Sequence, residues 1–484
     1  MSQTVRACLG LSSVLLLAAS AFATTPVVTV TSPANNSTVS APTHFVATAT
    51  SSGCSKGISA IRIYSAPGVS AYTVSGGKLN GYISLANGTY NTVVQAWDNC
   101  GGVAKANVTI TVNAQSAPAG FFYLTMSNWV PNGANNINNV IGYTIVAGGD
   151  GALAQTLQGP VNTNIFPIGA ATDKGGYRLY VADWDSGDVF AYYIYGNDGY
   201  IYPVPGSPFP VGRSVQAVAV SPSGDYVFAA RSENAPGDGI EVFQVQSNGS
   251  LVQAPGSPYA TQNGPYAMVV DPSGKFLYVG DTSNYIEAFA ISSSGYLTPL
   301  AGSPYPMPLP KNGCGVNPND TIDWAGKYLY TADRGDNSIS GYDINSSSGV
   351  PTAISGSPWS AEGGCIGGIN QSNFNPDSLA IDGTGKFMYA HNGDSFSISI
   401  FSINQSTGAL TWIKDTANTS AGALGPIRTD PTGNYLYTSS FQGGIDVYVI
   451  NHTTGDLTAS PSSPIPIPPD GNAYWTSFAV APPQ

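Results

Sequence analysis

One phrase recurs along this chain at nearly regular intervals, and it constrains the fold more than any other feature of the sequence. It reads DPSGKFLYVGD from Asp271, and variants begin at Thr172, Ser221, Asp323, Asp382 and Asp430. Successive starts are separated by 49, 50, 52, 59 and 48 residues. Periods of this size are typical of propellers and other repeat arrays, in which each repeat is one supersecondary unit.

Each repeat reads as four short strands separated by turns. In the copy around Asp271, GPYAMVV is a first strand, KFLYVGD a second, YIEAFAIS a third, and the segment after SSG a fourth, edge-like strand. Four strands in about 50 residues predict one propeller blade. The phrase GSP, at Gly206, Gly256, Gly302 and Gly356, marks the passage to the next blade.

The two ends of the repeat region complete one another. The region opens with FFYLTMSN and then NNVIGYTIVAGGDGALAQTL, which match second, third and fourth strands without a first. The chain ends with NAYWTSFAVAPP, which matches a first strand with nothing after it. The sequence therefore predicts an all-β, seven-bladed propeller over residues 121–484, closed by pairing of its N- and C-terminal parts.

The segments before the propeller have different compositions. Residues 1–23 read as a secretory signal, because one Arg precedes an apolar run and a small-x-small site ends at Ala23. Residues 26–114 alternate apolar and polar over short runs, as expected of a β-sandwich, and residues 115–120 form a linker. We expect a secreted or surface-associated protein with no transmembrane segment in the mature chain.

The sandwich segment, with VTVTSPANNSTVS near its start and NGTYNTVVQAWDNCGG near its end, resembles the immunoglobulin-like modules of bacterial secreted proteins. Such modules usually act as spacers or adhesive elements. After removal of the signal four cysteines remain, which allow three pairings. Their positions in the two domains favour the disulfides Cys54–Cys100 and Cys314–Cys365.

The repeat phrase, the GSP connectors, the SSGxLT turns and the count of seven blades together resemble the lactonase family of seven-bladed propellers, over about residues 119–484. That family includes phosphogluconolactonase-like hydrolases. The resemblance implies a site at the mouth of the central channel, on loops before first strands and between second and third strands. It implies an activated water and a cationic clamp for the oxyanion.

Three residues are candidates for that chemistry. The phrase DRGDNSIS matches a family loop and makes Arg334 the candidate clamp. Where the family carries a glutamate in the same blade this chain reads PNDTID, which offers Asn319 or Asp320, and we take Asp320 as the candidate; the family's histidine position is not filled. His391, in YAHNGD, is the one histidine expected at the channel mouth and is the candidate base.

The other function that the sequence supports is binding without chemistry, of a glycan or a peptide at the channel mouth, with the immunoglobulin-like module as a spacer. Aromatic side chains beside neutral hydrogen-bonding groups suit such ligands. The candidate ligand-binding residues are Trp129, Trp184, Tyr285, Trp359 and Trp475. We expect binding to be the principal function and extracytoplasmic lactone hydrolysis to be the alternative.

Other partner and cofactor classes find little support. The net charge of −12 argues against nucleic-acid binding, which needs a basic face. The sequence shows no Cys/His metal cluster, phosphate loop or dinucleotide fingerprint, so no organic cofactor is expected. The segment DWDSGD offers Asp183, Asp185 and Asp188 to a Ca²⁺ ion but lacks the spacing of a full calcium loop. The sequence is silent on oligomeric state.

Overall fold

The chain divides into two compact units between residues 115 and 116 in the computed structural model. The structure describes residues 25–40, 43–83, 85, 87–113, 118–127, 139–147, 150–163, 166–232, 237–281, 283–307, 319–322, 327–333, 338–360, 379–392, 397–416, 426–440, 444–466 and 474–484. For 40, 80–82, 113, 127, 197, 319–322, 333, 439–440, 466 and 474–476 the description covers the backbone only. The predicted signal, Cys314 and Cys365 lie outside the described residues.

The first unit is built from two sheets. One has the order β1-β3-β6 and the other β2-β8-β7-β4-β5, with β2 and β8 parallel and the remaining pairs antiparallel. Their strands are β1 (Val27–Ser32), β2 (Ser37–Ser40), β3 (Thr43–Thr50), β4 (Ile58–Ala66), β5 (Val69–Ser75), β6 (Lys78–Ile83), β7 (Gly88–Asp98) and β8 (Val103–Asn113).

Both sheets of the first unit contribute to one hydrophobic core. Phe45 from one sheet and Ile61, Val94 and Ile110 from the other are fully buried in it. Alternation of buried and exposed side chains along β3 and β7 is the period-2 pattern of strands with one covered face. A disulfide joins Cys54 and Cys100, as the sequence predicted.

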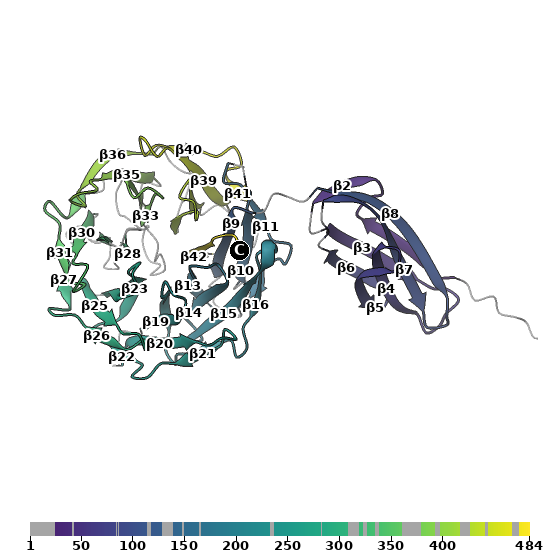
Figure 1. Cartoon of the computed structure of the whole chain (residues 1–484), viewed down its shortest axis with the longest axis horizontal. Coiled ribbons are helices and arrows are strands. Elements are labelled where there is room, and N and C mark those ends of the chain that lie inside the picture. Colours follow the sequence, from purple (N-terminus) through teal and green to yellow (C-terminus); the bar gives the residue numbers. More distant parts are fainter. Residues whose placement is uncertain are drawn as a thin grey trace, which may run out of the picture. The chain divides into compact units, whose positions relative to one another are not determined.

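The second unit contains, among the described residues, seven sheets that each have a path of four consecutive strands, and we call them blades 1 to 7 in chain order. Figure 1 shows them arranged around a common centre. Blades 1 to 3 consist of β9 (Gly120–Ser127), β10 (Asn139–Ile145), β11 (Leu153–Gln155) and β42 (Tyr474–Ala481); β13 (Pro167–Thr172), β14 (Arg178–Asp183), β15 (Asp188–Tyr195) and β16 (Tyr200–Pro203); and β18 (Val215–Val220), β19 (Tyr226–Arg231), β20 (Gly239–Val245) and β21 (Leu251–Gln253).

Blades 4 to 7 repeat the same antiparallel order. They consist of β23 (Pro265–Val270), β24 (Phe276–Asp281), β25 (Tyr285–Ile291) and β26 (Leu297–Pro299); β28 (Asn319–Ile322), β29 (Tyr328–Asp333), β30 (Ser338–Ile344) and β31 (Pro351–Ala353); β33 (Leu379–Ile381), β34 (Phe387–Asn392), β35 (Ser397–Ile403) and β36 (Leu410–Asp415); and β37 (Ile427–Thr429), β38 (Tyr435–Ser440), β39 (Gly444–Ile450) and β40 (Leu457–Ala459).

Short two-residue strands pair with the third strand of six blades, on the path to the next blade. They are β12 (Val161–Asn162), β17 (Phe209–Pro210), β22 (Tyr259–Ala260), β27 (Tyr305–Pro306), β32 (Trp359–Ser360) and β41 (Ile465–Pro466). The helix content of the described residues is one 3₁₀ turn, η1 (Gly196–Asp198), so the prediction of an all-β chain is confirmed there.

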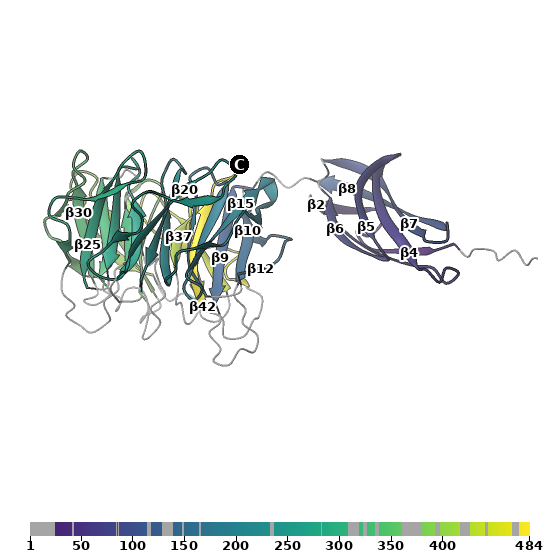
Figure 2. The ribbon, with the colours of Figure 1, turned by 90° about the horizontal axis from the view of Figure 1, so that it is seen from below.

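The first and last parts of the propeller region meet in blade 1. β42 pairs antiparallel with β9, from Tyr474 opposite Ser127 to Ala481 opposite Phe121, and the two strands lie side by side in Figure 2. Blade 7 packs against blade 1 through a core that contains Phe122, Phe478 and Tyr437. The ring of Phe122 lies 4.6 Å from that of Phe478 and 5.1 Å from that of Tyr437.

The recurring phrase of the sequence forms the turn from the first to the second strand of a blade. Asp271 accepts hydrogen bonds from the backbone N–H groups of Lys275 and Phe276, at 2.7 and 2.8 Å. Gly274 has φ +73°, a conformation that favours glycine. Asp382 and Asp430 hold their turns in the same way. The phrase therefore repeats because each blade needs this turn.

In five blades a tyrosine of the second strand joins the blade to the next one. Their hydroxyls donate to the carbonyl of a glycine in the turn between the third and fourth strands of the following blade. The pairs are Tyr123–Gly199 (3.0 Å), Tyr278–Gly349 (2.8 Å), Tyr330–Gly408 (2.7 Å), Tyr389–Gly455 (3.2 Å) and Tyr437–Gly151 (3.0 Å). The last pair connects blade 7 to blade 1.

The acceptor glycines cannot be replaced without strain. Gly455 has φ +77°, and a Cβ atom there would lie 2.5 Å from the ring of Phe387 in the preceding blade. The close approach of this turn to an aromatic ring thus requires a residue without a side chain.

The four GSP connectors, and the corresponding SSP of blade 7, act through the serine hydroxyl. In five blades this Oγ accepts a hydrogen bond from a backbone N–H of the third strand, at 2.8 to 3.0 Å: Ser207 from Ala191, Ser257 from Val242, Ser303 from Ala288, Ser357 from Gly341 and Ser463 from Val447. The connector therefore fixes the exit of the fourth strand against its own blade.

A first test concerns the hydrogen bond between blades 7 and 1. We expect Tyr437→Phe to lower the free energy of unfolding by about 1 to 3 kcal/mol, because it leaves the Gly151 carbonyl without its buried donor. Tyr180→Phe is the matched control, because the buried hydroxyl of Tyr180 has no hydrogen-bond partner among the described residues. Denaturant unfolding of the two variants should differ, and equal losses would contradict a role for the Tyr437 bond.

Candidate functional site

The candidate site lies at one end of the blades, which we call the mouth end. It comprises the turns between second and third strands and the connections into first strands, including residues 184–187, 211–214, 237–238, 261–264 and 283–284. The turns between first and second strands and between third and fourth strands lie at the opposite end, because the strands are antiparallel. Figure 2 shows the blades from the side.

Two of the three predicted catalytic residues belong to blade 5. The backbone of Asp320 lies in β28, opposite Thr331 of β29. Arg334 follows β29 directly in sequence and lies outside the described residues, as does the side chain of Asp320. The register places Asp320 in the innermost strand, beside the second strand that leads to Arg334.

His391 is not exposed at the mouth, contrary to what the sequence led us to expect. Its side chain is 0% exposed in β34, on the face of the strand that carries Phe387 and Tyr389 and packs against blade 7. Burial lowers the pKa of the imidazole to about 4. At neutral pH this ring is uncharged and out of reach of a dissolved substrate, which makes it a poor candidate for a base.

Two buried polar side chains, His391 and Thr438, stand on the faces of blades 6 and 7 that pack together. Neither ring nitrogen of His391 has a hydrogen-bond partner among the described residues, and the same holds for Oγ1 of Thr438. Thr438 shares with Leu436 the face of blade 7 that packs against blade 6. The neighbouring Asn392 donates to the hydroxyls of Ser397 and Ser399, at 3.1 and 2.8 Å.

The predicted ligand-binding aromatics occupy separate blades. Trp184 is half-buried in a turn of blade 2, where its ring contacts that of Phe166 edge-on at 6.1 Å. Tyr285 begins β25 in blade 4 and is 36% exposed. Trp359 is half-buried against the core between blades 5 and 6. Trp129 and the side chain of Trp475 lie outside the described residues.

The three aspartates proposed for Ca²⁺ do not converge. Asp183 is fully buried at the end of β14 and accepts the backbone N–H groups of Asp185 and Ser186, at 3.1 and 3.0 Å. Asp185 itself is exposed. Within the described part of the chain, the group of three metal-binding residue types with ligand atoms within 4.8 Å of one another is Cys54, Asp98 and Cys100, and those cysteines form a disulfide. Asp183 holds the turn instead.

A pair of carboxylates in blade 4 was not predicted from the sequence. Glu287 Oε1 accepts the backbone N–H of Gln262 at 2.7 Å, and Asp281 Oδ2 accepts the side-chain amide of Asn263 at 3.0 Å. Burial, and then the nearby charge of Asp281, raise the pKa of Glu287 to about 7. The local sequence YIEAFAIS gives no sign that the pKa of this glutamate is raised. Both side chains anchor the connection into the first strand.

The two arginines that the structure describes at the mouth end are already bound to carboxylates. Arg213 lies 3.4 Å from Asp238, and Arg231 lies 3.2 Å from Glu241. The Glu241 carboxylate also accepts the hydroxyl of Ser257 at 3.0 Å. All of these side chains are less than a quarter exposed, so the charges of the two arginines are locally neutralised.

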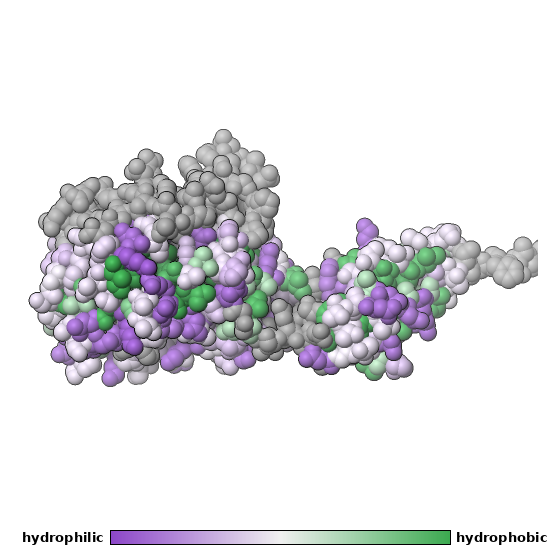
Figure 3. All heavy atoms as spheres, turned by 90° about the horizontal axis from the view of Figure 1, so that it is seen from above, coloured by the Kyte–Doolittle hydropathy of each residue, from purple (hydrophilic) through white to green (hydrophobic). Residues whose placement is uncertain are grey.

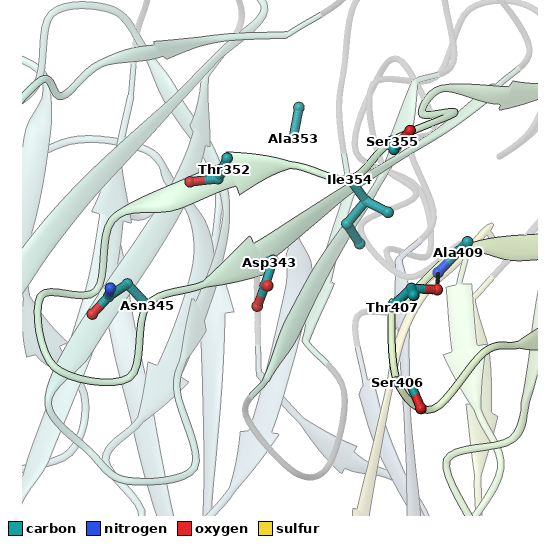
Figure 4. Close-up of a pocket in the computed structure, with 9 residues that line it drawn as sticks. All are labelled: Asp343, Asn345, Thr352, Ala353, Ile354, Ser355, Ser406, Thr407 and Ala409. Atoms are coloured by element: carbon teal, nitrogen blue, oxygen red, sulfur yellow. Dashed lines mark hydrogen bonds between the residues drawn. The ribbon is translucent and has the colours of Figure 1, made fainter.

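A cavity of about 620 Å³ lies away from the mouth, between the outer strands of blades 5 and 6. Figure 4 shows its lining, with the strands of blade 5 on one side and the turn before β36 on the other. The lining residues are Asp343, Asn345, Thr352, Ala353, Ile354, Ser355, Ser406, Thr407 and Ala409. Thr407 accepts the backbone N–H of Ala409 at 3.3 Å, so it holds the turn. None of the predicted site residues lines this groove.

On the side of the molecule drawn in Figure 3, apolar residues of the propeller lie interspersed with hydrophilic ones. Among the described residues, the exposed large apolar and aromatic side chains of the propeller are separated along several blades, for example Tyr195, Val252, Tyr296 and Trp412. Single exposed residues of this kind are normal on soluble domains and indicate no particular partner. No helix in the described part of the chain is long and apolar enough to cross a membrane.

The profile of the family Lactonase, 7-bladed beta-propeller, matches residues 201–314 and 321–424. These segments include the strands of blades 3, 4 and 6 and those of blade 5, except for residues 319–320 at the start of β28. A comparison with curated proteins finds no match.

Solved structures share the propeller fold at low sequence identity. The periplasmic gluconolactonase of Pseudomonas aeruginosa is 14% identical, with a TM-score of 0.59 over 75% of this chain and 99% of that one. A protein of Bacteroides uniformis ATCC 8492 with a provisional 6-phosphogluconolactonase assignment is 16% identical, with a TM-score of 0.57 over 75% of this chain and all of the other. At such identities the likeness establishes the fold alone.

Proposed function

We propose that the propeller hydrolyses a small-molecule lactone at its mouth end, with Asp320 and Arg334 as the working pair. The match of the lactonase family profile to residues 201–314 and 321–424 carries this proposal. The position of Asp320 in β28, beside the strand that leads to Arg334, supports it, because both residues then belong to the same end of blade 5.

In the proposed reaction the Asp320 carboxylate takes a proton from a water molecule, and the water oxygen forms a bond to the lactone carbonyl carbon. The Arg334 guanidinium stabilises the negative charge on the carbonyl oxygen. The bond between that carbon and the ring oxygen then breaks, and the ring oxygen takes up the proton. The product is a hydroxy acid, which releases one proton at neutral pH.

Proton release from a panel of sugar and aliphatic lactones tests the proposal on the purified mature protein. We expect Asp320→Asn and Arg334→Ala each to lower kcat/KM by about 10²-fold or more. Asp343→Asn is the matched control, because Asp343 is exposed at the opposite end of the same blade, and it should retain full activity. Turnover that survives both mouth-end substitutions would refute the assignment to blade 5.

The second candidate function is binding of a glycan or a peptide without chemistry. The exposure of Tyr285 at the mouth end favours it, since an exposed aromatic ring offers a flat apolar face to a ligand. Absence of turnover with every lactone, together with retention on a glycan array that Tyr285→Ala abolishes, would support this candidate instead.

We further propose that the protein is secreted, with the first unit as an immunoglobulin-like spacer. The Cys54–Cys100 disulfide supports this, because disulfides persist in oxidising compartments outside the cytoplasm. The two packed sheets of residues 27–113 support the spacer role. N-terminal sequencing of the exported protein should find a start near Thr24.

A further inference from the structure

The distribution of charge over the propeller indicates which lactones the mouth can admit. Carboxylates are frequent at the mouth end of the described residues. They stand at the ends of second strands, in the following turns, in the first residues of third strands, and at the end of one fourth strand: Asp183, Asp185, Asp188, Asp238, Glu241, Asp281, Glu287, Asp415 and Asp446.

Cations are distributed differently. The described cations of the mouth end are Arg213 and Arg231, and each is bound to a carboxylate. Those of the opposite end stand in or next to the turns between first and second strands: Lys174, Arg178, Lys275, Lys327 and Lys386. Carboxylates occur at both ends, so the segregation of the cations leaves the mouth as the more negative end.

One buried carboxylate strengthens this description. Asp183 is 0% exposed, and its Oδ2 atom has no hydrogen-bond partner among the described residues. Burial raises its pKa to about 6, so it is mainly ionised at pH 7. The charge of a carboxylate in a region of low dielectric acts on a ligand more strongly than that of an exposed one.

The remaining described cations are poorly placed to bind a phosphate group at the mouth end. Arg428 lies half-buried on the innermost strand β37, opposite Tyr437 and so midway along the sheet. Lys414 contacts Asp456. Lys311 and Arg334 lie outside the described residues, and the proposed function assigns Arg334 to the lactone carbonyl. A phosphate group needs guanidinium or ammonium donors of its own.

We propose that the mouth end accepts uncharged lactones and discriminates against phosphorylated ones. This inference rests on the proposed function and specifies its substrate class. A dianionic phosphate must approach several carboxylates without a free cation to meet it among the described residues, whereas an uncharged sugar lactone incurs no such repulsion. At physiological ionic strength the screening length is about 8 Å, so repulsion acts on a ligand in the mouth.

The test compares glucono-1,5-lactone with its 6-phosphate as substrates of the full-length mature protein. We expect kcat/KM to be about tenfold or more lower for the phosphorylated lactone, and the ratio to shrink as salt is raised from about 0.05 to about 0.5 M. Equal or faster turnover of the phosphorylated lactone would overturn the inference and leave the lactonase proposal standing.

A charge-reversal pair locates the effect. Asp185→Lys, at an exposed residue of the mouth end, should raise kcat/KM for the phosphorylated lactone about two- to fourfold and leave that of the uncharged lactone unchanged. Asp225→Lys makes the same charge change at an exposed residue of the opposite end and should alter neither value. An identical response to both variants would show that net charge, and not the mouth, sets the preference.

If no lactone is turned over, the proposed function fails, and a second measurement still tests the charge inference. The relaxation of amide protons at residues 185–187 is then compared between an anionic and a cationic nitroxide of equal size. Stronger relaxation by the cationic probe supports an anion-repelling mouth. Equal relaxation, or stronger relaxation by the anionic probe, overturns it.

Discussion

Replacing Phe122 by alanine is expected to lower the free energy of unfolding of the propeller by about 3 to 5 kcal/mol. Phe122 is fully buried in the core that joins blades 7 and 1, with its ring 4.6 Å from Phe478 and 5.1 Å from Tyr437. Phe478 belongs to β42, near the end of the chain, so one side chain packs the C-terminal strand and the last blade against the first. Its removal leaves a cavity that these surrounding elements can fill only in part.

The measurement is equilibrium unfolding in denaturant, with Phe289→Ala as the control. Phe289 is 2% exposed in the core between blades 3 and 4, and its loss should be similar because the chemistry of the substitution is the same. A cost below about 1 kcal/mol for Phe122→Ala, beside the full cost for Phe289→Ala, would contradict the packing of blade 7 on blade 1.

Acidification is expected to destabilise the protein by about 3 kcal/mol through His391 alone. The pKa of His391 falls from 6.5 to about 4 on folding, because burial disfavours the charged imidazole. The unfolded chain therefore binds the proton more tightly. The contribution of His391 is unaffected above about pH 7, is lost as pH falls through 6.5 towards 4, and is constant below about pH 4.

Two other buried groups act in the opposite direction over the same range. The pKa values of Asp183 and Glu287 are raised to about 6 and about 7, so the folded state binds their protons more tightly and falling pH favours folding through them. The effect of His391 is therefore read as a difference. We expect the free energy of unfolding of His391→Leu to lose about 3 kcal/mol less than the wild type between pH 7 and pH 4.

His452→Gln serves as the control for this titration. His452 is partly exposed and bonded to Asp382 at 2.9 Å, so its replacement should preserve the acid loss that His391 causes. Parallel curves for the wild type and His391→Leu would show that the imidazole titrates alike in the folded and unfolded chain, and that it is not held in a dry environment.

The periodic features of the fold were the predictable ones. The spacing of the repeated phrase indicated the four-stranded units, because an aspartate that caps a turn, a glycine with positive φ and an aromatic residue at the next strand form a local signal. The Cys54–Cys100 bond was predictable from the positions of four cysteines. The role of Ser463 was not, since its connector reads SSP and lacks the glycine of the other four.

The candidate site was less predictable because its properties depend on contacts across blades. His391 follows a second-strand motif, and its position in that motif places it on the face turned to blade 7, where burial determines its pKa. The segment YAHNGD, taken alone, suggested an exposed loop. Glu287 is likewise one polar residue in an apolar strand, and its raised pKa comes from burial and from Asp281. Neither property has a local sequence signal.

The tyrosine-to-glycine bonds between blades have a consequence for how such a chain can change over evolutionary time. They commit the turns between third and fourth strands to fixed geometry, because a side chain on Gly408 or Gly455 would collide with the preceding blade. The connections at the mouth end vary in length. The connection before β23 is residues 261–264, whereas that before β33 is residues 361–378. Insertions, and with them new specificities, are therefore expected to accumulate at one end while the other remains constant.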